Sequence, residues 1–345
     1  MTTVYDVARL AGVSTATVSR VVRGSDLVHP ETRQRVIEVI EQLGFVPDGS
    51  AQGLSRRRKD IIGLVALERG VDEIDIERSS VLFVDQIVHA AEAVLRGTEC
   101  SLLLSFGPRG EPFQRRVRSL SGKVDGLLMA EEVMPADQLR ALARRVPIVL
   151  IAGPRAEHEL DVVTVDNASG IRSLVAHLTR EHGYRRLCFI GGPLDSPDAQ
   201  ERLAAFSQMV RDTPGCACDP VIHGDFSEAS GSAAAQVVLG RPSLPEAVAC
   251  ANDQMAIGVL REFQQAGIRL PSTVAVTGFD DIFPSRMVDP SLTTVSQPLH
   301  ELGTLAAQRL LARIDGGAKL PPLAEVLPTH LVIRASCGCP QSGTR

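Results

Sequence analysis

Polar side chains directly follow two apolar stretches in the C-terminal half of the chain. Asn252 follows AVACA, and the carboxylates of Asp280 and Asp281 follow VAVTGF. If these stretches are parallel strands, the polar groups lie outside the carboxyl ends of a sheet, where α/β proteins bind ligands. A joint acid–base role for the two aspartates is disfavoured because adjacent strand residues point to opposite sides. The pattern therefore favours binding of a small molecule over catalysis.

Motifs of the common enzyme classes are absent from the sequence. It contains no G-x-S-x-G elbow, no H-E-x-x-H, no phosphate-binding P-loop and no G-x-G-x-x-G turn. We therefore expect a protein that is not an enzyme and that uses no cofactor.

The seven cysteines include two closely spaced pairs, Cys216/Cys218 and Cys337/Cys339. Zinc sites more often use C-x₂₋₄-C spacing together with further ligands. Free thiols are the usual state in a reducing cytoplasm. We therefore expect neither a structural metal nor a disulfide.

Charge is distributed unevenly along the chain. Residues 1–60 carry nine Lys/Arg and seven Asp/Glu, a net charge of +2, whereas the whole chain carries −5 and the remainder therefore −7. This asymmetry indicates an anionic partner at the N-terminal end only.

The composition is that of a globular protein, with 44% apolar and 22% charged residues. No apolar run is long enough to span a bilayer, and the N-terminus lacks the basic start and apolar core of a signal peptide. We therefore expect a cytoplasmic protein with no membrane partner.

The N-terminal region has the pattern of three short helices. Apolar residues at helical spacing predict helices at 4–11, at 15 to about 23 and at 30 to about 43. Thr3 and Asp6 have capping-box spacing, and Ser14 is a candidate cap for the second helix. The faces expected to be buried carry Val4, Val7, Ala8 and Ala11, then Val18, Val21 and Val22, and then Val36, Ile37, Ile40 and Leu43. A tight turn between the first two helices is typical of a helix-turn-helix.

After a linker at 47–50, apolar stretches alternate with amphipathic ones. Strands are predicted at 61–67, 101–105, 125–129, 147–152, 186–192, 247–253 and 274–281, with a helix near 83–96. Apolar strands separated by helices imply parallel sheets that are covered on both faces. Residues 61–345 are too many for a single hydrophobic core, so we expect two α/β lobes.

From Thr3 to about Ala335 the chain resembles the lactose-repressor (LacI/GalR) family. The resemblance is carried by DVARLAGVSTATVSRVVRG, PETRQRVIEVIEQLGFVP and AQGL, and then by VDGLLMA, VDNASG, FIGGPLDS, ERLAAF, GDFSEASG, ANDQMA, VTGFDD and LTTVSQP. It implies an all-α helix-turn-helix headpiece (1–47), a hinge (48–60) and a two-lobed α/β sensor domain (61–345) with parallel sheets of the periplasmic-binding-protein type. The N-lobe is expected at about 61–161 and 293–318, and the C-lobe at about 162–292 and 319–340.

The resemblance also implies a function. It indicates a nucleoid-associated transcription repressor that binds a pseudo-palindromic operator as a homodimer. A small molecule between the lobes, a sugar or a sugar derivative, would set its affinity for double-stranded DNA. We expect a dimer because family tetramers carry a C-terminal heptad helix that is absent here. The rival interpretation is a periplasmic sugar-binding protein, which would need a signal peptide and would not need residues 1–60.

Recognition helices present their N-terminal residues to base edges in the major groove. By resemblance, Thr15 and Ala16 would contact bases, and Arg20 would donate two hydrogen bonds to a guanine. The other expected DNA contacts in the headpiece, mostly to phosphates, are Thr3, Tyr5, Thr17, Ser19 and Arg23. A solvated polar helix face is the alternative interpretation.

Leu54 is a lone leucine in the basic segment 50–58. Its family role is to wedge between base pairs from the minor groove, which kinks DNA. Ala51, one turn earlier, would let two hinge helices approach closely. Gly49 and Gly53 depart from the family pattern and disfavour helix by about 1 kcal/mol each relative to alanine. The hinge is therefore expected to order only on DNA.

Four polar residues from separate motifs converge in the family cleft: Arg202, Asn252, Asp280 and Gln297. An arginine and an aspartate flanked by amides can hold vicinal hydroxyls through charge-assisted hydrogen bonds, which favours a sugar. The remaining expected contacts are Phe83 and Phe226, which would stack on the ligand, Ser196 and Asp198, which would tune specificity, and Arg155. The alternatives are an ion pair of Arg202 with Asp280 that holds the lobes, and core packing of Phe226.

Three further features depart from the family pattern. His29 replaces the usual serine cap of the third helix. The loop at 68–82 is long and acidic and lacks the usual Asn-Pro before Phe83. The chain has no tryptophan, the strongest sugar-stacking residue. The sequence therefore does not identify the ligand.

Overall fold

The computed structural model describes residues 2–22, 25, 27–45, 58–68, 81–130, 133–153, 160–316 and 320–339. The chain forms two compact units, residues 1–59 and 60–345. Among the described helices, none is long and apolar enough to cross a membrane.

The first unit contains three helices around a small core. They are α1 (Val4–Ala11), α2 (Thr15–Val22) and α3 (Pro30–Leu43), close to the predicted bounds. Val7, Val18 and Val36 are fully buried at its centre. The prediction for Ile37 is wrong, since it is 37% exposed and Val39 is buried in its place.

Local capping follows the sequence. The backbone N–H and hydroxyl of Thr3 both donate to Asp6 Oδ2, at 3.0 and 2.7 Å. Ser14 Oγ accepts from the Thr17 N–H at 3.1 Å. His29, at the N-cap of α3, makes no capping hydrogen bond with its side chain, and the weaker helix start expected there stays a prediction.

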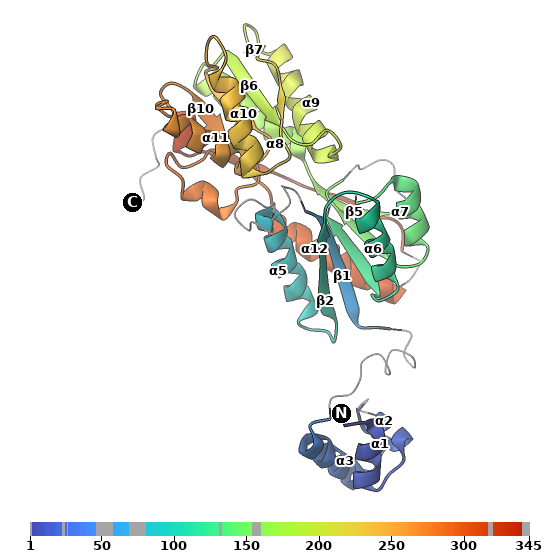
Figure 1. Cartoon of the computed structure of the whole chain (residues 1–345). Helices are drawn as coiled ribbons and strands as arrows, with labels where there is room; N and C mark the ends of the chain where they lie inside the picture. The colour runs from blue at the N-terminus through green and yellow to red at the C-terminus, as the bar shows by residue number, and fades with distance from the viewer. Residues whose placement is uncertain are drawn as a thin grey trace. The chain divides into compact units, whose positions relative to one another are not determined.

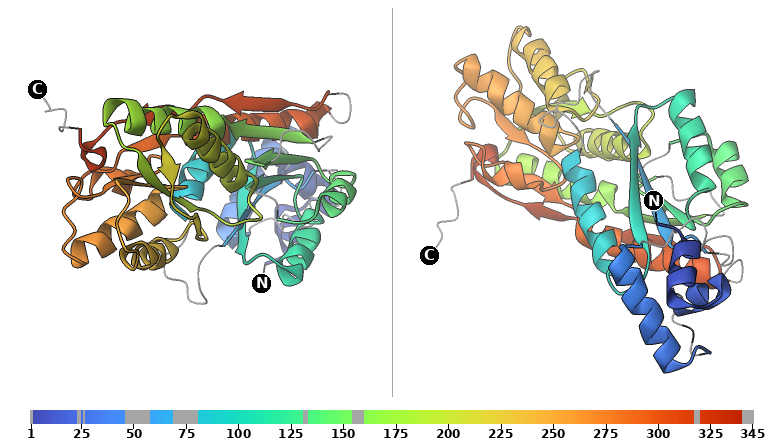
Figure 2. Two further views of the ribbon diagram at one scale, coloured as in Figure 1. Left: turned by 90° about the horizontal axis from the view of Figure 1, so that it is seen from above. Right: turned by 60° about the horizontal axis from the view of Figure 1, so that its bottom comes forward.

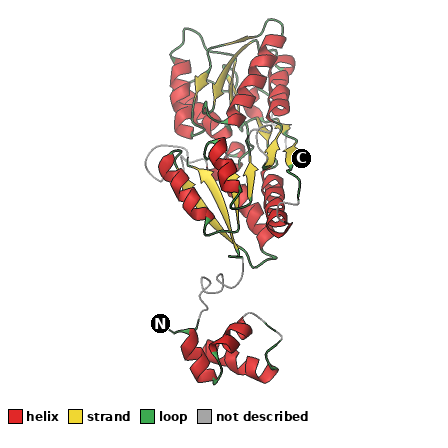
Figure 3. Cartoon of the chain, turned by 90° about the vertical axis from the view of Figure 1, so that its right-hand side faces the viewer, coloured by secondary structure: helices red, strands yellow, loops and turns green. Residues whose placement is uncertain are grey.

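The second unit has two lobes, each with a parallel sheet flanked by helices (Figures 1 and 3). The N-lobe sheet has the order β12-β5-β4-β3-β1-β2, and all of its pairings are parallel. Its strands are β1 (Ile61–Leu67), β2 (Ser101–Gly107), β3 (Gly126–Ala130), β4 (Ile148–Ile151), β5 (Asp161–Val165) and β12 (Ala324–Leu327).

Helices cover both faces of the N-lobe sheet. One face packs against α5 (Val81–Leu95) and α12 (Leu299–Gly316), and the other packs against α6 (Glu111–Ser121) and α7 (Ala136–Ala143). In Figure 1 α12 lies beside α5, and in Figure 2 its orange-red ribbon again runs close to the blue-green α5, so segments far apart in sequence build this lobe together.

The C-lobe sheet has the order β10-β9-β6-β7, with β8 also paired to β6. Its strands are β6 (Arg186–Gly191), β7 (Ala217–Cys218), β8 (Ile222–His223), β9 (Ala247–Cys250) and β10 (Ala275–Thr277). Its helices are α8 (Asn167–Ala176), η1 (His177–Glu181, a π-helix), α9 (Pro197–Asp212), α10 (Glu228–Leu239), α11 (Asp253–Gln265) and the short 3₁₀ turn η2 (Phe283–Arg286).

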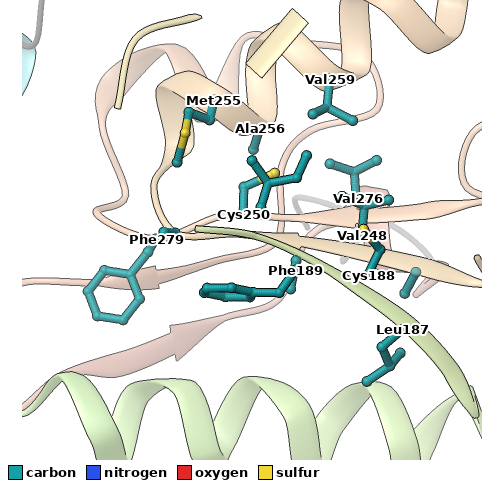
Figure 4. Close-up of a cluster of buried hydrophobic side chains, with 14 of the residues drawn as sticks. Leu187, Cys188, Phe189, Val248, Cys250, Met255, Ala256, Val259, Val276 and Phe279 are labelled. Atoms are coloured by element: carbon teal, nitrogen blue, oxygen red, sulfur yellow. The ribbon is translucent and has the colours of Figure 1, made fainter. Parts of the chain in front are cut away.

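One continuous apolar core fills the C-lobe. Figure 4 shows Met255, Ala256 and Val259 of α11 against strand residues such as Val248 and Val276. The helices α10 and α11 lie so close that a Cβ atom on Gly231 or Gly258 would stand 2.1 or 2.2 Å from a backbone oxygen of the facing helix. Only glycine fits at these two positions.

The structure corrects the expected lobe boundaries. Residues 162–165 and 324–327 were assigned to the C-lobe, but β5 and β12 pair with each other in the N-lobe sheet. Conversely, residues 294–296 were assigned to the N-lobe. They form β11 (Thr294–Ser296), which pairs with β13 (His330–Val332) and bridges to the C-lobe at Asp280. The short β13 leads into a 3₁₀ turn, η4 (Ala335–Cys337).

Candidate functional site

A pocket lies between the two lobes at the carboxyl ends of their strands. The space between its walls, counted together with the open solvent at its mouth, is about 530 Å³. The residues that line it are Ala66, Leu67, Phe83, Val84 and Ala130 from the N-lobe, and Ser196, Asp198, Arg202, Phe226, Asn252, Gln254 and Asp280 from the C-lobe.

An ion pair of two buried side chains occupies the C-lobe side. Arg202 Nη1 lies 3.5 Å from Asp280 Oδ1, and the two side chains are 5% and 7% exposed. Gln297 Nε2 donates to the same carboxylate oxygen at 2.5 Å. Because both partners border the pocket, a bound ligand can contact their polar atoms.

The guanidinium of Arg202 is fixed on several sides. Its Nε donates to Asn167 Oδ1 at 2.8 Å, and its Nη1 donates to the Ala251 carbonyl at 2.7 Å. Its Cζ lies 3.8 Å from the centre of the Phe279 ring, a cation–π contact. Asn167 Nδ2 in turn donates to Asp198 Oδ1 at 2.8 Å, which extends the network to the pocket wall.

The polar groups of the pocket stand at the ends of strands and at the starts of helices. Asp280 follows β10 and has a φ of 116°, and Phe226 has a φ of 74°. Such strain in residues other than glycine persists where the surrounding structure imposes it, and it gathers at ligand sites. Ser196 caps α9 by accepting from the Ala199 N–H, and Asn252 caps α11 by accepting from the Met255 N–H.

The two sides of the pocket differ in polarity. The described lining residues of the N-lobe are all apolar, and they come from the ends of β1 and β3 and from the first turn of α5. The C-lobe supplies the charged and amide groups, so a ligand here meets a polar surface on one side and an apolar one on the other.

An ion pair at 2.8 Å between the N-lobe residue Arg109 and the C-lobe residue Asp195 also joins the lobes. Both of its side chains are exposed, so it contributes about 0–1 kcal/mol.

The structure brings together most of the predicted effector residues. Phe83, Ser196, Asp198, Arg202, Phe226, Asn252 and Asp280 all line the pocket. Gln297 stands behind Asp280 as its hydrogen-bond partner. Phe226 belongs to the C-lobe core as well as to the pocket wall, so its core packing is confirmed and its stacking on a ligand stays a prediction. Arg155 lies outside the described residues.

Sequence analysis missed other parts of the site. Ala66, Leu67, Val84, Ala130 and Gln254 line the pocket, and Asn167 positions Arg202. A signal for Asn167 was present, because it follows a strand in the VDNASG segment.

Asp253 stands in the chain between the pocket residues Asn252 and Gln254 and is fully buried. Its Oδ1 accepts from the Thr294 hydroxyl at 2.5 Å, and its Oδ2 accepts from the Ile282 N–H at 3.0 Å. Burial, together with the nearby charge of Asp280, raises the pKa of Asp253 well above its usual value despite these hydrogen bonds. The folded protein therefore holds a proton on Asp253 at pH values where the unfolded chain has released it.

This raised pKa predicts a pH-dependent stability. The contribution of Asp253 is lost as pH rises from the unfolded value of 3.8 towards the raised folded value. Asp253→Asn keeps an acceptor for Ile282 and removes the titrating proton, so its melting temperature is expected to fall less between pH 5 and 8 than that of the unsubstituted protein. Asp225→Asn is the control, because hydrogen bonds from Ser227 outweigh burial and lower the pKa of Asp225. If the melting temperature of both variants falls with pH as steeply as that of the unsubstituted protein, Asp253 does not titrate in this range.

Seven of the residues predicted to contact DNA are described in the structure, and they lie at the start of α1 and along α2. Ala16 and Arg20 of α2, Thr3 and Tyr5 are exposed, and the Tyr5 side chain is 73% exposed. Thr15, Thr17 and Ser19 are half-buried along α2. Among the described residues, none is recorded as a hydrogen-bond or ion-pair partner of the Arg20 guanidinium. Arg23, Ala51 and Leu54 lie outside the described residues.

Comparison with known proteins identifies the family to which the chain belongs. Residues 3–48 match the family described as bacterial regulatory proteins, lacI family, and residues 175–337 match the periplasmic binding protein-like domain. The HTH-type transcriptional regulator CelR of Thermobifida fusca is 34% identical over 337 residues, which cover 96% of each chain. The chain belongs to the LacI family. It is therefore a DNA-binding transcriptional regulator.

Solved structures of this family have the same fold over nearly the whole chain. A lac repressor dimer bound to operator and the anti-inducer ONPF has a TM-score of 0.82 and 28% identity, with 97% of this chain and 99% of that chain covered. A CelR–cellobiose complex has a TM-score of 0.70 and 34% identity, with 97% and 100% covered. The two-lobed, periplasmic-binding-protein-like architecture with parallel sheets is thus confirmed.

Proposed function

We propose that this LacI-family protein represses transcription as a homodimer on a pseudo-palindromic operator, and that a neutral sugar between the two lobes controls its DNA affinity. The observation that carries the proposal is the buried Arg202–Asp280 pair at the edge of the interlobe pocket. A buried charge pair that also borders a cavity can exchange hydrogen bonds with ligand hydroxyls.

The shape and charge of the pocket favour a sugar. A sugar ring has hydroxyl groups around its edge and apolar C–H faces, which match the polar C-lobe side and the apolar N-lobe side. The rings of Phe83 and Phe226 provide flat apolar surface in the lining. The described lining carries one cation, Arg202, and two acidic groups, Asp198 and Asp280. This balance disfavours a phosphorylated ligand.

The relatives support the same assignment. The CelR complex contains cellobiose, and the lac repressor complex is a dimer on operator DNA. A twofold dimer presents two equal recognition helices, which is why the operator is expected to be a pseudo-palindrome, with an easily unstacked pyrimidine–purine step at its centre. Leu54 is proposed to wedge into that step, and Ala51 is proposed to let the two hinge helices approach closely on the DNA.

A screen of ligands by thermal shift tests the proposal. A ligand that binds only the folded state raises the melting temperature, and the neutral mono- and disaccharides are expected to contain one that does. Phosphorylated sugars and nucleobases serve as the competing classes. Selection of DNA from a random pool, repeated with the sugar present, then gives the operator and the direction of control. A nucleobase as the sole stabilising ligand would contradict the sugar assignment, and an asymmetric consensus would contradict the dimer.

Arg20→Ala tests the direct contact to a base. The substitution is expected to weaken operator binding by about 1–3 kcal/mol and to relax the preference at one base pair in each half-site. Arg35→Ala, on the exposed surface of α3, removes the same charge and is the control. Fluorescence anisotropy on operator and on random DNA measures both variants. Equal losses on the two DNAs would mean that Arg20 contacts phosphate instead.

A further inference from the structure

Four side chains from distant parts of the sequence meet in the C-lobe, away from the residues that line the pocket. They are His177, His182, Cys337 and Cys339, and one nitrogen or sulfur atom of each lies within 4.8 Å of all the others. Cys337 and His177 are buried, and His182 and Cys339 are half-buried. Sequence analysis expected these cysteines to be free thiols without a metal, because it considered C-x-C spacing alone.

Four of the six distances between these atoms are close to the edges of a metal tetrahedron, and all six are at most 4.8 Å. His177 Nε2 lies 3.4 Å from Cys337 Sγ and 3.7 Å from Cys339 Sγ. His182 Nε2 lies 3.3 Å from Cys339 Sγ and 3.2 Å from His177 Nε2. With metal–sulfur bonds of about 2.3 Å and metal–nitrogen bonds of about 2.05 Å, a regular tetrahedron has sulfur–nitrogen edges of about 3.5 Å and a nitrogen–nitrogen edge of about 3.3 Å.

We propose that His177, His182, Cys337 and Cys339 bind a zinc ion that fastens the C-terminal segment to the end of α8. Two thiolates and two imidazoles in a tetrahedral array are a ligand set typical of structural zinc sites. Four protein ligands leave no open position, so the site is structural. Binding forms two zinc–sulfur and two zinc–nitrogen bonds and releases the two thiol protons to solvent.

Local backbone structure brings the two histidines together. His177 begins the π-helix η1 and His182 directly follows it, so the pair has H-x₄-H spacing, within the range of known zinc sites. A π-helix places residues five apart one above the other, and such turns are frequent at functional sites.

The two cysteines are held by a tight turn. Gly338 between them has a φ of 101°, and a Cβ atom there would lie 3.2 Å from the Tyr184 hydroxyl. The Tyr184 O–H donates to the Cys337 carbonyl at 3.0 Å, and the Tyr184 ring stacks on His182 with ring centres 5.3 Å apart. The turn and the histidines are thus positioned by the protein itself.

The site connects to the effector pocket through the same segment. Arg334, just before η4, donates to Asp281 Oδ1 at 2.5 Å, and Asp281 follows the pocket residue Asp280. The proposed zinc therefore anchors a segment whose other contacts support the pocket.

Metal analysis of the full-length chain, purified without a histidine tag and under reducing conditions, tests the proposal. We expect one zinc ion per chain. After the zinc is removed and replaced by Co²⁺, we expect the visible bands and the sulfur-to-metal charge-transfer band of tetrahedral Co²⁺ with two thiolates. The Cys337→Ser/Cys339→Ser variant is expected to lose both the zinc and the Co²⁺ spectrum.

The second C-x-C pair of the chain is a matched control. Cys216→Ser/Cys218→Ser changes the same residue types at the same spacing outside the cluster, and is expected to keep the zinc and the spectrum. His182→Gln replaces a half-buried ligand and leaves the sequence of the C-terminal turn unchanged. It therefore tests the site even if the double-serine variant misfolds. It is expected to shift the Co²⁺ bands and weaken binding at least tenfold. Three outcomes would overturn the proposal. The purified chain could take up neither metal, mass spectrometry could find a Cys337–Cys339 disulfide instead, or the Co²⁺ spectrum could be unchanged in His182→Gln.

Discussion

Asp280→Ala is expected to lower the affinity of the sensor unit for its sugar by roughly 10²- to 10⁴-fold. The carboxylate is buried beside the pocket and already accepts a hydrogen bond from Gln297. Hydrogen bonds from ligand hydroxyls to a charged group contribute about 1.5–3 kcal/mol each, and two such bonds account for the expected factor. Calorimetric titration with the sugar identified by the thermal-shift screen measures it.

The same variant is expected to lose the response of its DNA binding to the sugar. A ligand shifts an equilibrium only through a difference in its affinity for the two states. Operator binding without sugar should survive, because Asp280 lies outside the headpiece. Operator anisotropy is therefore expected to be the same at every sugar concentration that changes it for the unsubstituted protein.

Two further variants separate ligand binding from folding. Asp280→Asn keeps the size of the side chain, and Arg202 retains its hydrogen bonds to Asn167 and the Ala251 carbonyl. The affinity of this variant for the sugar is expected to fall at least tenfold. Asp219→Ala removes another C-lobe carboxylate that is paired with arginines, Arg186 and Arg241, but lies outside the pocket lining. It should bind sugar normally. Normal binding and response in Asp280→Ala would instead make Asp280 a structural residue at a strand end.

Local patterns were enough to predict most elements of the fold. Strand β1 was predicted at the residues observed, because IIGLVAL is a continuous apolar run that ends before a polar segment. The helices of the first unit were predicted within a residue or two, since Gly12 ends α1 in a left-handed conformation and Ser14 caps α2. These signals lie in adjacent residues, which is why a single sequence reveals them.

Pairings between distant segments were not predictable in the same way. Periodicity shows that DVVTV is apolar, but not whether β5 joins β4 or crosses to the next lobe. The polar contacts of Asp161 with α12, about 150 residues away, tie β5 to the N-lobe. The zinc-ligand cluster was missed for the same reason, because its histidine pair and its cysteine pair lie far apart in the chain.

The candidate site was predicted where a polar residue follows a strand, and missed where the wall is apolar. Asn252 and Asp280 stand out because amides and carboxylates are rare beside apolar strands. Ala66, Leu67 and Ala130 end their strands as ordinary core-like residues, so their position on the pocket wall depends on how the two lobes pack. Sequence patterns carry little information about that packing.

Asp161→Ala is expected to destabilise the second unit by about 3–5 kcal/mol, since it breaks a buried ion cluster. The Asp161 side chain is 1% exposed and accepts from Arg309 Nη2 at 2.9 Å, from Arg313 Nε and Nη2 at 2.9 and 2.8 Å, and from the Leu323 N–H at 2.8 Å. Burial opposes ionisation of Asp161, but the hydrogen bonds from Arg313, Arg309 and Leu323 outweigh it and lower its pKa. The stabilising contribution is therefore present above the unfolded pKa of 3.8 and is lost only as pH falls through the lowered folded value.

Truncation of Asp161 leaves two arginines, 15% and 17% exposed, without their carboxylate. At neutral pH the melting temperature is expected to fall by roughly 6–20 °C, at about 2–4 °C for each kcal/mol. Replacing the whole cluster, as Asp161→Leu with Arg309→Met and Arg313→Met, is expected to recover most of that loss, because apolar substitutes for a complete buried ion cluster are often neutral. Scanning calorimetry of the full chain measures both variants. A shift below about 3 °C for Asp161→Ala would show that the two arginines are sufficiently held by the carbonyls of Leu320 and Pro321, and that β5 does not depend on this cluster.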